Sequence, residues 1–248
     1  GWNSLGNVPW SSGSSSSITA PTVALSSNGT SLATASLENG GNNWNVQVWE
    51  WNTSSWTPKG MPVIQNSTSN PFLSLSLDIS GDGETFVIGD WTIATMAVNV
   101  YAYRWDGQEW NSLGSSPSFS WGPVAVTMRN DGNGFAVATP TPSTSRVYEW
   151  NETIQDWEVV GNDLLGGTAI ALADDGRRVV VGSPTISIVS IYDQNSGGSW
   201  DLTAVLNSTI GDQFGSSLSI GGDGNILVVG SPLDDQGGNN AGQVTVYA

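Results

Sequence analysis

Cysteine and histidine are both missing from the 248 residues of this chain. Their absence excludes a Ser-His-Asp triad, a thiolate nucleophile, an imidazole general base and a Cys/His zinc site. Catalysis would have to use carboxylates, Tyr, Lys59 or a metal held by oxygen ligands. A chain without cysteine fits a reducing cytosol and a disulfide-free secreted protein equally well, so this absence does not decide the compartment.

Basic residues are also few, because six Lys and Arg stand against 22 Asp and Glu, a formal net charge of −16. An acidic surface repels phosphate backbones and anionic lipid headgroups, so no nucleic-acid partner is expected. No apolar run approaches the roughly 18 residues of a membrane span, and no charged and apolar leader precedes Trp2, as expected of a mature or trimmed chain. We predict no membrane insertion and no cofactor.

Helix-favouring stretches of Ala, Leu, Glu and Lys are missing too, whereas Gly, Ser, Thr and Asn are abundant. This composition predicts an all-β protein with many turns. A phrase that begins with Trp recurs along the chain, at intervals of 54, 54, 47 and 43 residues. The phrases begin at Trp2, Trp56, Trp110, Trp157 and Trp200.

Each Trp phrase is followed by two alternating apolar runs with a turn dipeptide between them, and then by a third apolar run. Asn-Gly or Asp-Gly between strand-like runs predicts a hairpin with a type I′ turn, in which both central residues have positive φ. The dipeptides are Asn28-Gly29, Asp82-Gly83, Asp131-Gly132, Asp175-Gly176 and Asp223-Gly224. The third runs cover residues 46–51, 98–105, 146–150, 189–193 and 244–248.

Four short strands in each of five repeats predict a single five-bladed β-propeller with four-stranded antiparallel blades. Residues 2–6 are expected to pair with residues 243–248 as the outermost strand of the last blade, which closes the ring. A β-sandwich is the alternative, but it does not explain five Trp phrases in register. The repeats cover approximately residues 7–60, 61–114, 115–161, 162–204 and 205–248, the last completed by residues 1–6.

The fifth repeat contains Phe214-Gly215, the turn at Asp223-Gly224, Val228–Pro232 and Gly242–Tyr247. With these pieces it resembles the FG-GAP repeat of integrin α-subunit propellers and related extracellular proteins. Repeat four keeps one segment of this pattern, Val179–Pro184, and the earlier repeats keep only the hairpin turn and the third strand. The resemblance implies a role in extracellular adhesion or assembly.

The calcium-binding loop of that family resembles Asp-x-Asp-x-Asp-Gly, which offers oxygen ligands at alternate positions. The corresponding loops of this chain are shorter and carry fewer carboxylates. We therefore interpret them as plain hairpin turns and expect no bound metal. Only the loop from Asp78 to Glu84 keeps a calcium alternative.

Five Asn-x-Ser/Thr sequons fall in predicted turns, where an exposed acceptor must lie, and we predict N-linked glycans on them. The alternative is that turns are simply rich in Asn. Asn28 is the poorest candidate, because a tight hairpin leaves a transferase little room. The Ser-rich segment 11–17 is interpreted as a flexible loop whose O-glycosylation stays open. The sequon residues are Asn28, Asn52, Asn66, Asn151 and Asn207.

Most Trp residues recur with the repeat and are interpreted as packing between blades. Four others do not recur, and they lie in or beside connections that emerge on one face of a propeller. Exposed aromatic rings on one face favour a surface that binds a partner, although rings that only cover the blade ends are the alternative. The predicted partner-binding residues are Trp10, Trp44, Trp91 and Trp121.

The sequence thus predicts a secreted, non-catalytic glycoprotein of the cell surface, which acts in adhesion or as a structural subunit. Its expected partner is an extracellular protein or another copy of itself. A lectin with one sugar pocket in each blade is the main alternative, although the loops differ between repeats. A carboxylate glycosidase is less favoured, because no acidic trio recurs at the starts of the inner strands. Acidic residues near the Trp-bearing face are Asp90, Asp163, Asp212, Asp234 and Asp235.

Overall fold

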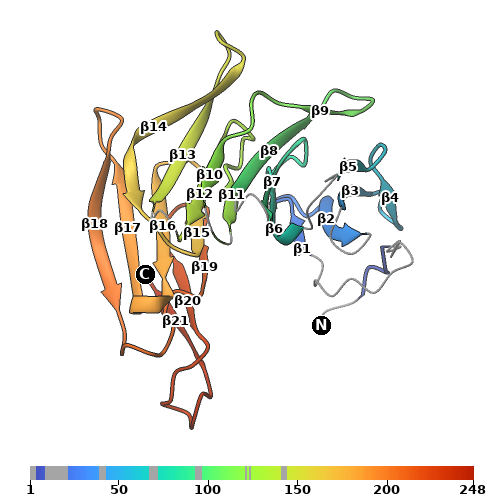
Figure 1. The fold of residues 1–248 in the computed structure, drawn as a ribbon. Helices are drawn as coiled ribbons and strands as arrows, with labels where there is room; N and C mark the ends of the chain where they lie inside the picture. Colours follow the sequence, from blue (N-terminus) through green and yellow to red (C-terminus); the bar gives the residue numbers. More distant parts are fainter. Residues whose placement is uncertain are drawn as a thin grey trace.

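The computed structural model describes residues 4–8, 22–38, 43–66, 72–92, 97–120, 122, 124–140 and 144–248. Its strands form five antiparallel sheets, arranged one after another as the blades of a β-propeller (Figure 1). The predicted all-β, five-bladed fold is confirmed. Within these residues helix is limited to the 3-10 turn η2 (Pro184–Ile186), and no helix is long and apolar enough to cross a membrane.

Every blade begins with its innermost strand and runs outward along the chain. Blade 1 contains β1 (Thr22–Leu25), β2 (Ser31–Glu38), β3 (Asn43–Trp51), β4 (Trp56–Pro58) and β5 (Val63–Asn66). Blade 2 contains β6 (Phe72–Ile79), β7 (Thr85–Thr92), β8 (Ala97–Trp105), β9 (Trp110–Ser112) and β10 (Ser118–Ser120). Blade 3 contains β11 (Ala125–Met128), β12 (Gly134–Thr139), β13 (Thr144–Asn151) and β14 (Asp156–Leu165). Blade 4 contains β15 (Ala169–Leu172), β16 (Arg178–Ser183), β17 (Ile188–Gln194) and β18 (Trp200–Asn207), and blade 5 contains β19 (Ser217–Ile220), β20 (Leu227–Ser231) and β21 (Gln243–Tyr247).

The hairpins between the first and second strands occur where the dipeptides predict them, but they are not type I′ turns. In blade 1 the N–H of Gly29 donates to the carbonyl of Ser26 at 2.8 Å, so Gly29 is the last residue of the turn. Gly29 has φ +72°, whereas Asn28 is not among the described residues with positive φ. The Asn28 carboxamide instead accepts the N–H of Thr30 at 2.9 Å. Asn or Asp followed by Gly therefore supports a wider turn, with a side-chain acceptor and a left-handed Gly.

The outer strand of blades 1 and 2 is divided into two segments. Both β4 and β5 pair with β3, and both β9 and β10 pair with β8. The break comes just after the Trp phrase, where Gly60 and Gly114 have φ values of +73° and +71°. The Trp phrases at 56, 110, 157 and 200 thus form the outer strands, as predicted.

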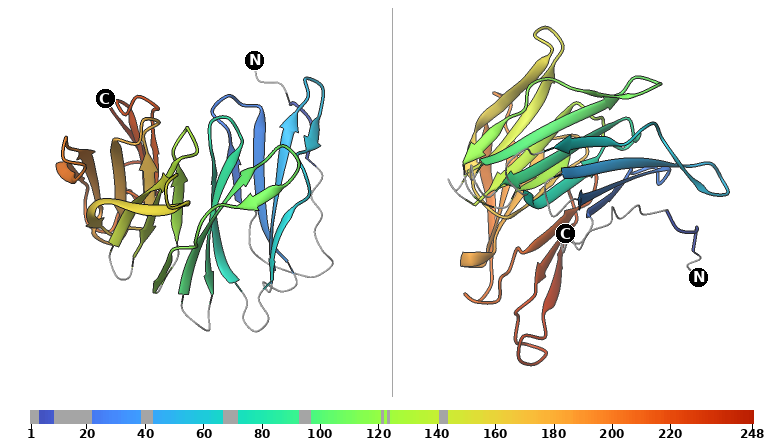
Figure 2. Two further views of the ribbon diagram at one scale, coloured as in Figure 1. Left: turned by 90° about the horizontal axis from the view of Figure 1, so that it is seen from above. Right: turned by 45° about the vertical axis from the view of Figure 1, so that its right-hand side comes forward.

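The core lies between blades and not within them. Figure 2 shows the five sheets following one another in chain order. Four buried apolar clusters join blades 1 and 2, 2 and 3, 3 and 4, and 4 and 5. Each blade presents large side chains to the blade before it, such as Phe86 of blade 2 and Phe135 of blade 3. From their second strands, blades 1 and 3 present small residues such as Ala33 and Ala136 to the blade after them, and on blade 1 these lie in the same cluster as the larger Trp44. This front-to-back packing sets the order of the blades.

A Trp hydrogen bond recurs at three of these contacts. The indole Nε1–H of Trp110 donates to the carbonyl of Lys59 at 2.9 Å. Trp157 donates in the same way to Leu113 at 2.8 Å, and Trp200 donates to Val160 at 2.9 Å. These rings therefore pack between blades, as the sequence predicts.

Closure of the ring is not confirmed and stays a prediction. In the part of the chain that is described, the fifth sheet has three strands, in the order β19-β20-β21. Residues 4–8 form no strand, and residues 1–3 lie outside the described residues. Val23 of blade 1 is 61% exposed and Val244 of blade 5 is 69% exposed, so the two terminal blades do not cover each other.

Candidate functional site

One face of the propeller carries the connections from the second to the third strand of each blade and from each outer strand to the next blade. We call it the loop face. The two types of connection meet there, since the N–H of Ser208 donates to the carbonyl of Ser187 at 3.2 Å and Leu233 N–H donates to Asp212 at 3.2 Å. Of the four predicted partner-binding Trp residues, Trp44 and Trp91 lie in the described part of the chain, near the ends of β3 and β7 that adjoin these connections.

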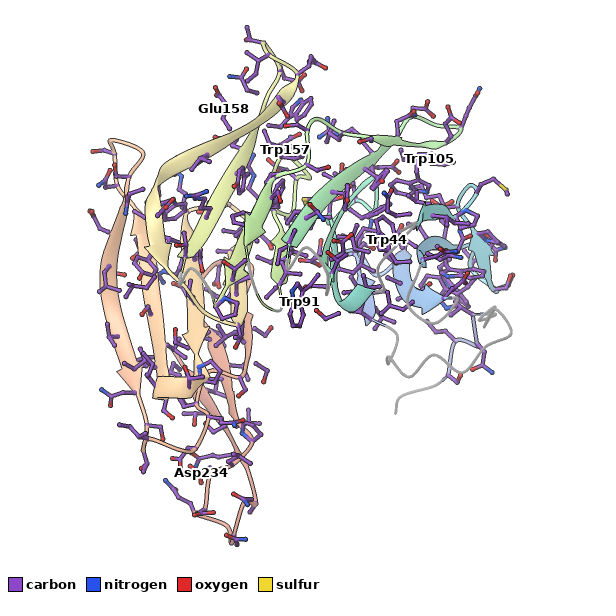
Figure 3. All side chains as sticks on the ribbon, in the orientation of Figure 1. Trp44, Trp91, Trp105, Trp157, Glu158 and Asp234 are labelled. Atoms are coloured by element: carbon purple, nitrogen blue, oxygen red, sulfur yellow. The ribbon has the colours of Figure 1, made fainter. Side chains whose placement is uncertain are left out.

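Trp44 does not lie on an exposed surface, which corrects its assignment to a partner-binding surface. Its side chain is 0% exposed and packs between blades 1 and 2, with its ring 5.7 Å from that of Tyr101 (Figure 3). The indole Nε1–H donates to Oδ2 of Asp90 at 2.9 Å. Trp44 is a core residue that covers the end of this blade contact, as in the alternative interpretation.

Asp90 is itself 0% exposed and also accepts a hydrogen bond from the Asn99 amide at 3.2 Å. Burial raises the pKa of Asp90, while the hydrogen bonds from Trp44 and Asn99 oppose that rise. Burial, together with the nearby Asp90 charge, also raises the pKa of Tyr101 to about 12. The Asp90 carboxyl group is therefore buried in the contact between blades 1 and 2 and is not accessible to a substrate.

Trp91 is half-buried and packs against the cluster between blades 2 and 3, together with Phe119. Its indole nitrogen is buried and has no hydrogen-bond partner among the described residues. Trp10 and Trp121 lie outside the described residues, so their assignment to a partner surface stays a prediction.

A groove of about 400 Å³ opens on the loop face between blades 3 and 4. Four aliphatic side chains in its lining are strongly exposed: Leu165 (61%), Ile186 (55%), Leu202 (51%) and Val205 (47%). Leu165 ends the outer strand of blade 3, whereas Leu202 and Val205 belong to the outer strand of blade 4. The groove thus gathers apolar side chains from two blades at one place.

Hydrogen bonds hold the walls of this groove. The Ser183 hydroxyl donates to the carbonyl of Gly166 at 2.9 Å, which ties the connection of blade 4 to the chain that enters it. The N–H of Leu165 donates to the Tyr192 hydroxyl at 3.3 Å. Ser187, at the end of η2, has a left-handed backbone with φ 52° and is fully buried. The groove is therefore built from ordered backbone and not from long flexible side chains.

The other acidic residues near this face are also engaged within the chain. Asp163 makes two bonds to the Arg146 guanidinium, at 2.6 and 2.8 Å, and these hydrogen bonds hold the pKa of Asp163 below its ordinary value. Asp212 accepts the Ser208 hydroxyl at 3.0 Å. Asp234, 2% exposed, accepts the N–H of Gln236 at 2.8 Å, and Asp235 accepts that of Asn240 at 2.7 Å.

In the loop from Asp78 to Glu84, for which the sequence left a calcium site as an alternative, the three carboxylates bind different partners. Asp78 accepts the N–H of Met128 at 2.7 Å and the Thr127 hydroxyl at 3.0 Å. Burial raises the pKa of Asp78 despite these hydrogen bonds. Asp82 accepts the Ser80 hydroxyl at 2.6 Å, while Glu84 pairs with Lys59 at 2.6 Å. Among the described residues, no three acidic side chains form a group that would hold a metal ion.

The sequons lie at strand ends as well as in turns. Asn28 and Asn52 are exposed and occupy turns, and the Asn52 carboxamide accepts the N–H of Ser55 at 2.9 Å. Asn151 ends β13, and its Nδ2 donates to Glu158 at 2.7 Å. Asn207, which is exposed, ends β18 opposite Ile188, beside the apolar groove. Asn66 ends β5, and its side chain lies outside what the structure describes. Asn28 and Asn52 thus lie in turns as predicted, whereas Asn66, Asn151 and Asn207 are the last residues of strands.

The sequence reasoning missed the groove. Its aliphatic residues come from three separate segments, and only the packing of blades 3 and 4 brings them together. A signal was nevertheless present in β18, where the pattern D-L-T-A-V-L places more apolar side chains than a strand with one buried face needs.

Comparison with known proteins supports the fold. The FG-GAP repeat family matches residues 202–247, which cover blade 5 and most of the strand before it. No curated protein matches the sequence. A functionally unknown protein from Desulfotomaculum acetoxidans is similar, with TM-score 0.61, 15% identity, 84% of this chain and 61% of that chain covered. This chain therefore spans about three fifths of its length.

Two further solved structures share the fold at low identity. The periplasmic gluconolactonase of Pseudomonas aeruginosa has TM-score 0.59 and 12% identity, over 84% of this chain and 63% of that one. TolB from Acinetobacter baumannii has TM-score 0.55 and 13% identity, and the match covers 91% of this chain and 50% of that one. The repeat match and the five blades together make this chain an FG-GAP-like β-propeller protein.

Proposed function

We propose that this chain is an extracellular, non-catalytic module that acts in adhesion or as a structural subunit, and that it contacts a protein partner through its loop face. The observation that carries the proposal is the apolar groove between blades 3 and 4. Leaving Leu165, Ile186 and Leu202 in water is unfavourable, and a rimmed apolar patch on a soluble domain is typical of an interaction site.

The chemistry of the groove selects the kind of partner. Its exposed apolar side chains are aliphatic, and among the described residues no aromatic ring or carboxylate belongs to its lining. Sugar rings are usually bound by aromatic faces together with polar side chains, so the lining favours aliphatic side chains of a protein. A second copy of this chain is the partner we favour. With a net charge of −16, two copies repel each other, and salt should therefore strengthen their association.

An extracellular location has separate support. Proteins with FG-GAP repeats are typically extracellular, and Asn28, Asn52 and Asn207 are exposed acceptors in sequons. Glycans at these positions would project from the rims and leave the contacts between blades intact.

Sedimentation of purified protein across a range of salt concentrations tests the proposal. Leu202→Asp and Val205→Asp place a charge in the groove, and we expect them to weaken self-association at least tenfold. Ile154→Asp is the matched control, because Ile154 is 55% exposed in the turn between β13 and β14, on the opposite face. It should associate like the wild type.

Equal association of all variants would contradict a role of the groove, and a wild type that stays monomeric at every salt concentration would contradict self-association. A glycan array and a reaction screen on polysaccharides address the lectin and glycosidase alternatives, for which we expect no binding and no turnover.

A further inference from the structure

A turn on the loop face carries a strongly exposed aliphatic side chain. Ile210 lies in the connection from β18 to β19 and is 82% exposed. Gly211 follows it with φ +112°, which suits the third position of a type II turn. The N–H of Asp212 donates to the carbonyl of Thr209 at 3.2 Å and closes the turn. Ile210 therefore occupies the apex of this turn.

Hydrogen bonds on both sides hold the turn in place. On the side of blade 4, the N–H of Ser208 donates to the carbonyl of Ser187 at 3.2 Å. On the side of blade 5, the N–H of Leu233 donates to the carbonyl of Asp212 at 3.2 Å. The Asp212 carboxylate also accepts the Ser208 hydroxyl at 3.0 Å. Because the backbone is already fixed, binding of the side chain at the apex costs little conformational entropy.

The turn borders the apolar groove between blades 3 and 4. Ser187, to which the turn is bonded, directly follows Ile186 of the groove lining. Ile210 is not part of that lining and stays exposed, so it does not fill the groove of its own chain. An apolar knob and an apolar groove thus lie beside each other on the loop face.

A β-bulge in β18 directs two aliphatic side chains into the groove. The pairing of β18 with β17 shifts by one residue at Thr203. In a regular strand, residues three positions apart point to opposite faces. The extra residue of the bulge places Leu202 and Val205 on the same face, and both line the groove. The fold thus concentrates apolar surface in the groove beside the Ile210 turn.

The loop face carries fewer free carboxylates than the opposite face, which holds the hairpin turns. Asp90 and Asp234 are buried, and Asp163 is paired with Arg146. The acidic residues that remain on the loop face are Glu38, Asp212 and Asp235. Exposed acidic residues in or beside the turns of the opposite face are Asp82, Asp106, Glu109, Glu152, Glu158, Asp174, Asp175 and Asp223. Two copies of this chain therefore repel each other less when their loop faces meet than when the opposite faces meet.

A knob and a groove on one face allow two copies to bind each other reciprocally. Across a two-fold axis, the Ile210 turn of each copy meets the groove of the other, and the contact closes at two copies. A knob elsewhere on the molecule would build an open chain instead. Met61, which is 80% exposed between the two outer segments of blade 1, is such a competing knob.

We propose that this protein forms a closed dimer in which Ile210 of each copy occupies the groove of the other, against Leu165, Ile186 and Val205. This proposal rests on the proposed function, because it assigns the residue of the second copy that fills the groove. The contact removes an exposed apolar side chain and an exposed apolar groove from water at the same time, twice in each dimer.

Sedimentation at high salt tests the closed dimer. We expect the wild type to reach twice the mass of the 25.9 kDa chain and to stop there as the protein concentration rises. Ile210→Asp should weaken association at least tenfold, as Leu202→Asp does. The matched control is Met61→Asp, which changes a side chain of similar exposure and should associate like the wild type.

The same experiment separates this proposal from the proposed function. If Leu202→Asp weakens association and Ile210→Asp does not, the groove binds another part of the partner and the role of Ile210 is wrong. Species that keep growing with concentration, and that Met61→Asp abolishes, would assign the contact to an open chain and overturn the closed dimer. A wild type that stays monomeric contradicts both proposals.

Disulfide formation maps the contact directly, since the chain has no cysteine of its own. An equal mixture of the Ile210→Cys and Val205→Cys variants should give a covalent heterodimer under mild oxidation, identified by its intact mass. The control mixture of Met61→Cys and Val205→Cys should give far less. Equal yields from the two mixtures, or no heterodimer from the first, would show that Ile210 does not enter the groove.

Discussion

The indole of Trp44 donates a hydrogen bond of 2.9 Å to Oδ2 of Asp90, and neither side chain is exposed to solvent. The bond joins β3 of blade 1 to β7 of blade 2. A buried carboxylate is costly unless hydrogen bonds satisfy it. This pair therefore has a structural role in the contact between blades 1 and 2. The sequence alone had assigned Trp44 to a surface that binds a partner.

Replacement of Trp44 by Phe should destabilise the protein without changing its association. Phe keeps most of the apolar contact but leaves the buried Asp90 without one donor, which typically costs about 1–3 kcal/mol. Chemical denaturation measures the loss, and sedimentation of the same variant should match the wild type. A Trp44→Phe variant with unchanged stability and weaker self-association would show instead that Trp44 belongs to a surface that binds a partner.

The Asp90→Asn variant should reveal the raised pKa of Asp90 through the dependence of stability on pH. The folded protein binds the Asp90 proton more readily than the unfolded chain, whose ordinary value is 3.8. The wild type therefore gains stability relative to Asp90→Asn as pH falls from the folded-state pKa toward that value, because Asn does not titrate. Denaturation curves between neutral and acidic pH measure the difference. A difference that stays constant, or that changes in the opposite direction, contradicts the raised pKa.

The position of Trp44 could have been predicted from the sequence. Trp44, Val46 and Val48 alternate with polar residues along one strand, which is the period of a buried strand face. Reading this Trp as part of a connection overlooked that period. The five blades were predictable because each repeats the same Trp phrase, turn and strand. The groove was not, because Leu165, Ile186 and Leu202 are far apart in sequence and meet only through the packing of two blades.

N-linked glycans are expected on at least two of Asn52, Asn66, Asn151 and Asn207 in protein from its natural source. The intact mass should therefore exceed the 25.9 kDa of the bare chain. A mass equal to the bare chain would contradict secretion through a glycosylating pathway.

A glycan on Asn207 would border the apolar groove, since Asn207 pairs with Ile188 at its edge. We expect Asn207→Gln in glycosylated protein to strengthen self-association, because a glycan beside the groove restricts the access of a second copy to it. Asn52→Gln, in the turn between β3 and β4, is the control and should change nothing. Sedimentation measures the self-association of both variants. Equal association of Asn207→Gln and Asn52→Gln would show that the glycan on Asn207 has no effect on the groove.

Calcium should not stabilise this protein. A calcium site needs about six or more oxygens that converge at roughly 2.4 Å, whereas Asp78, Asp82 and Glu84 each bind a different partner within the protein. Chelator should leave the melting temperature unchanged at moderate salt. A fall of several degrees would show that the family's metal loop works here.

The most direct measurement is a structure of the assembled protein, purified from its natural source with glycans and neighbours retained. We predict that aliphatic side chains of a neighbouring protein copy fill the groove between blades 3 and 4 and contact Leu202 and Val205. Neighbours that contact other faces and leave this groove filled only by water or by a sugar chain would contradict the account.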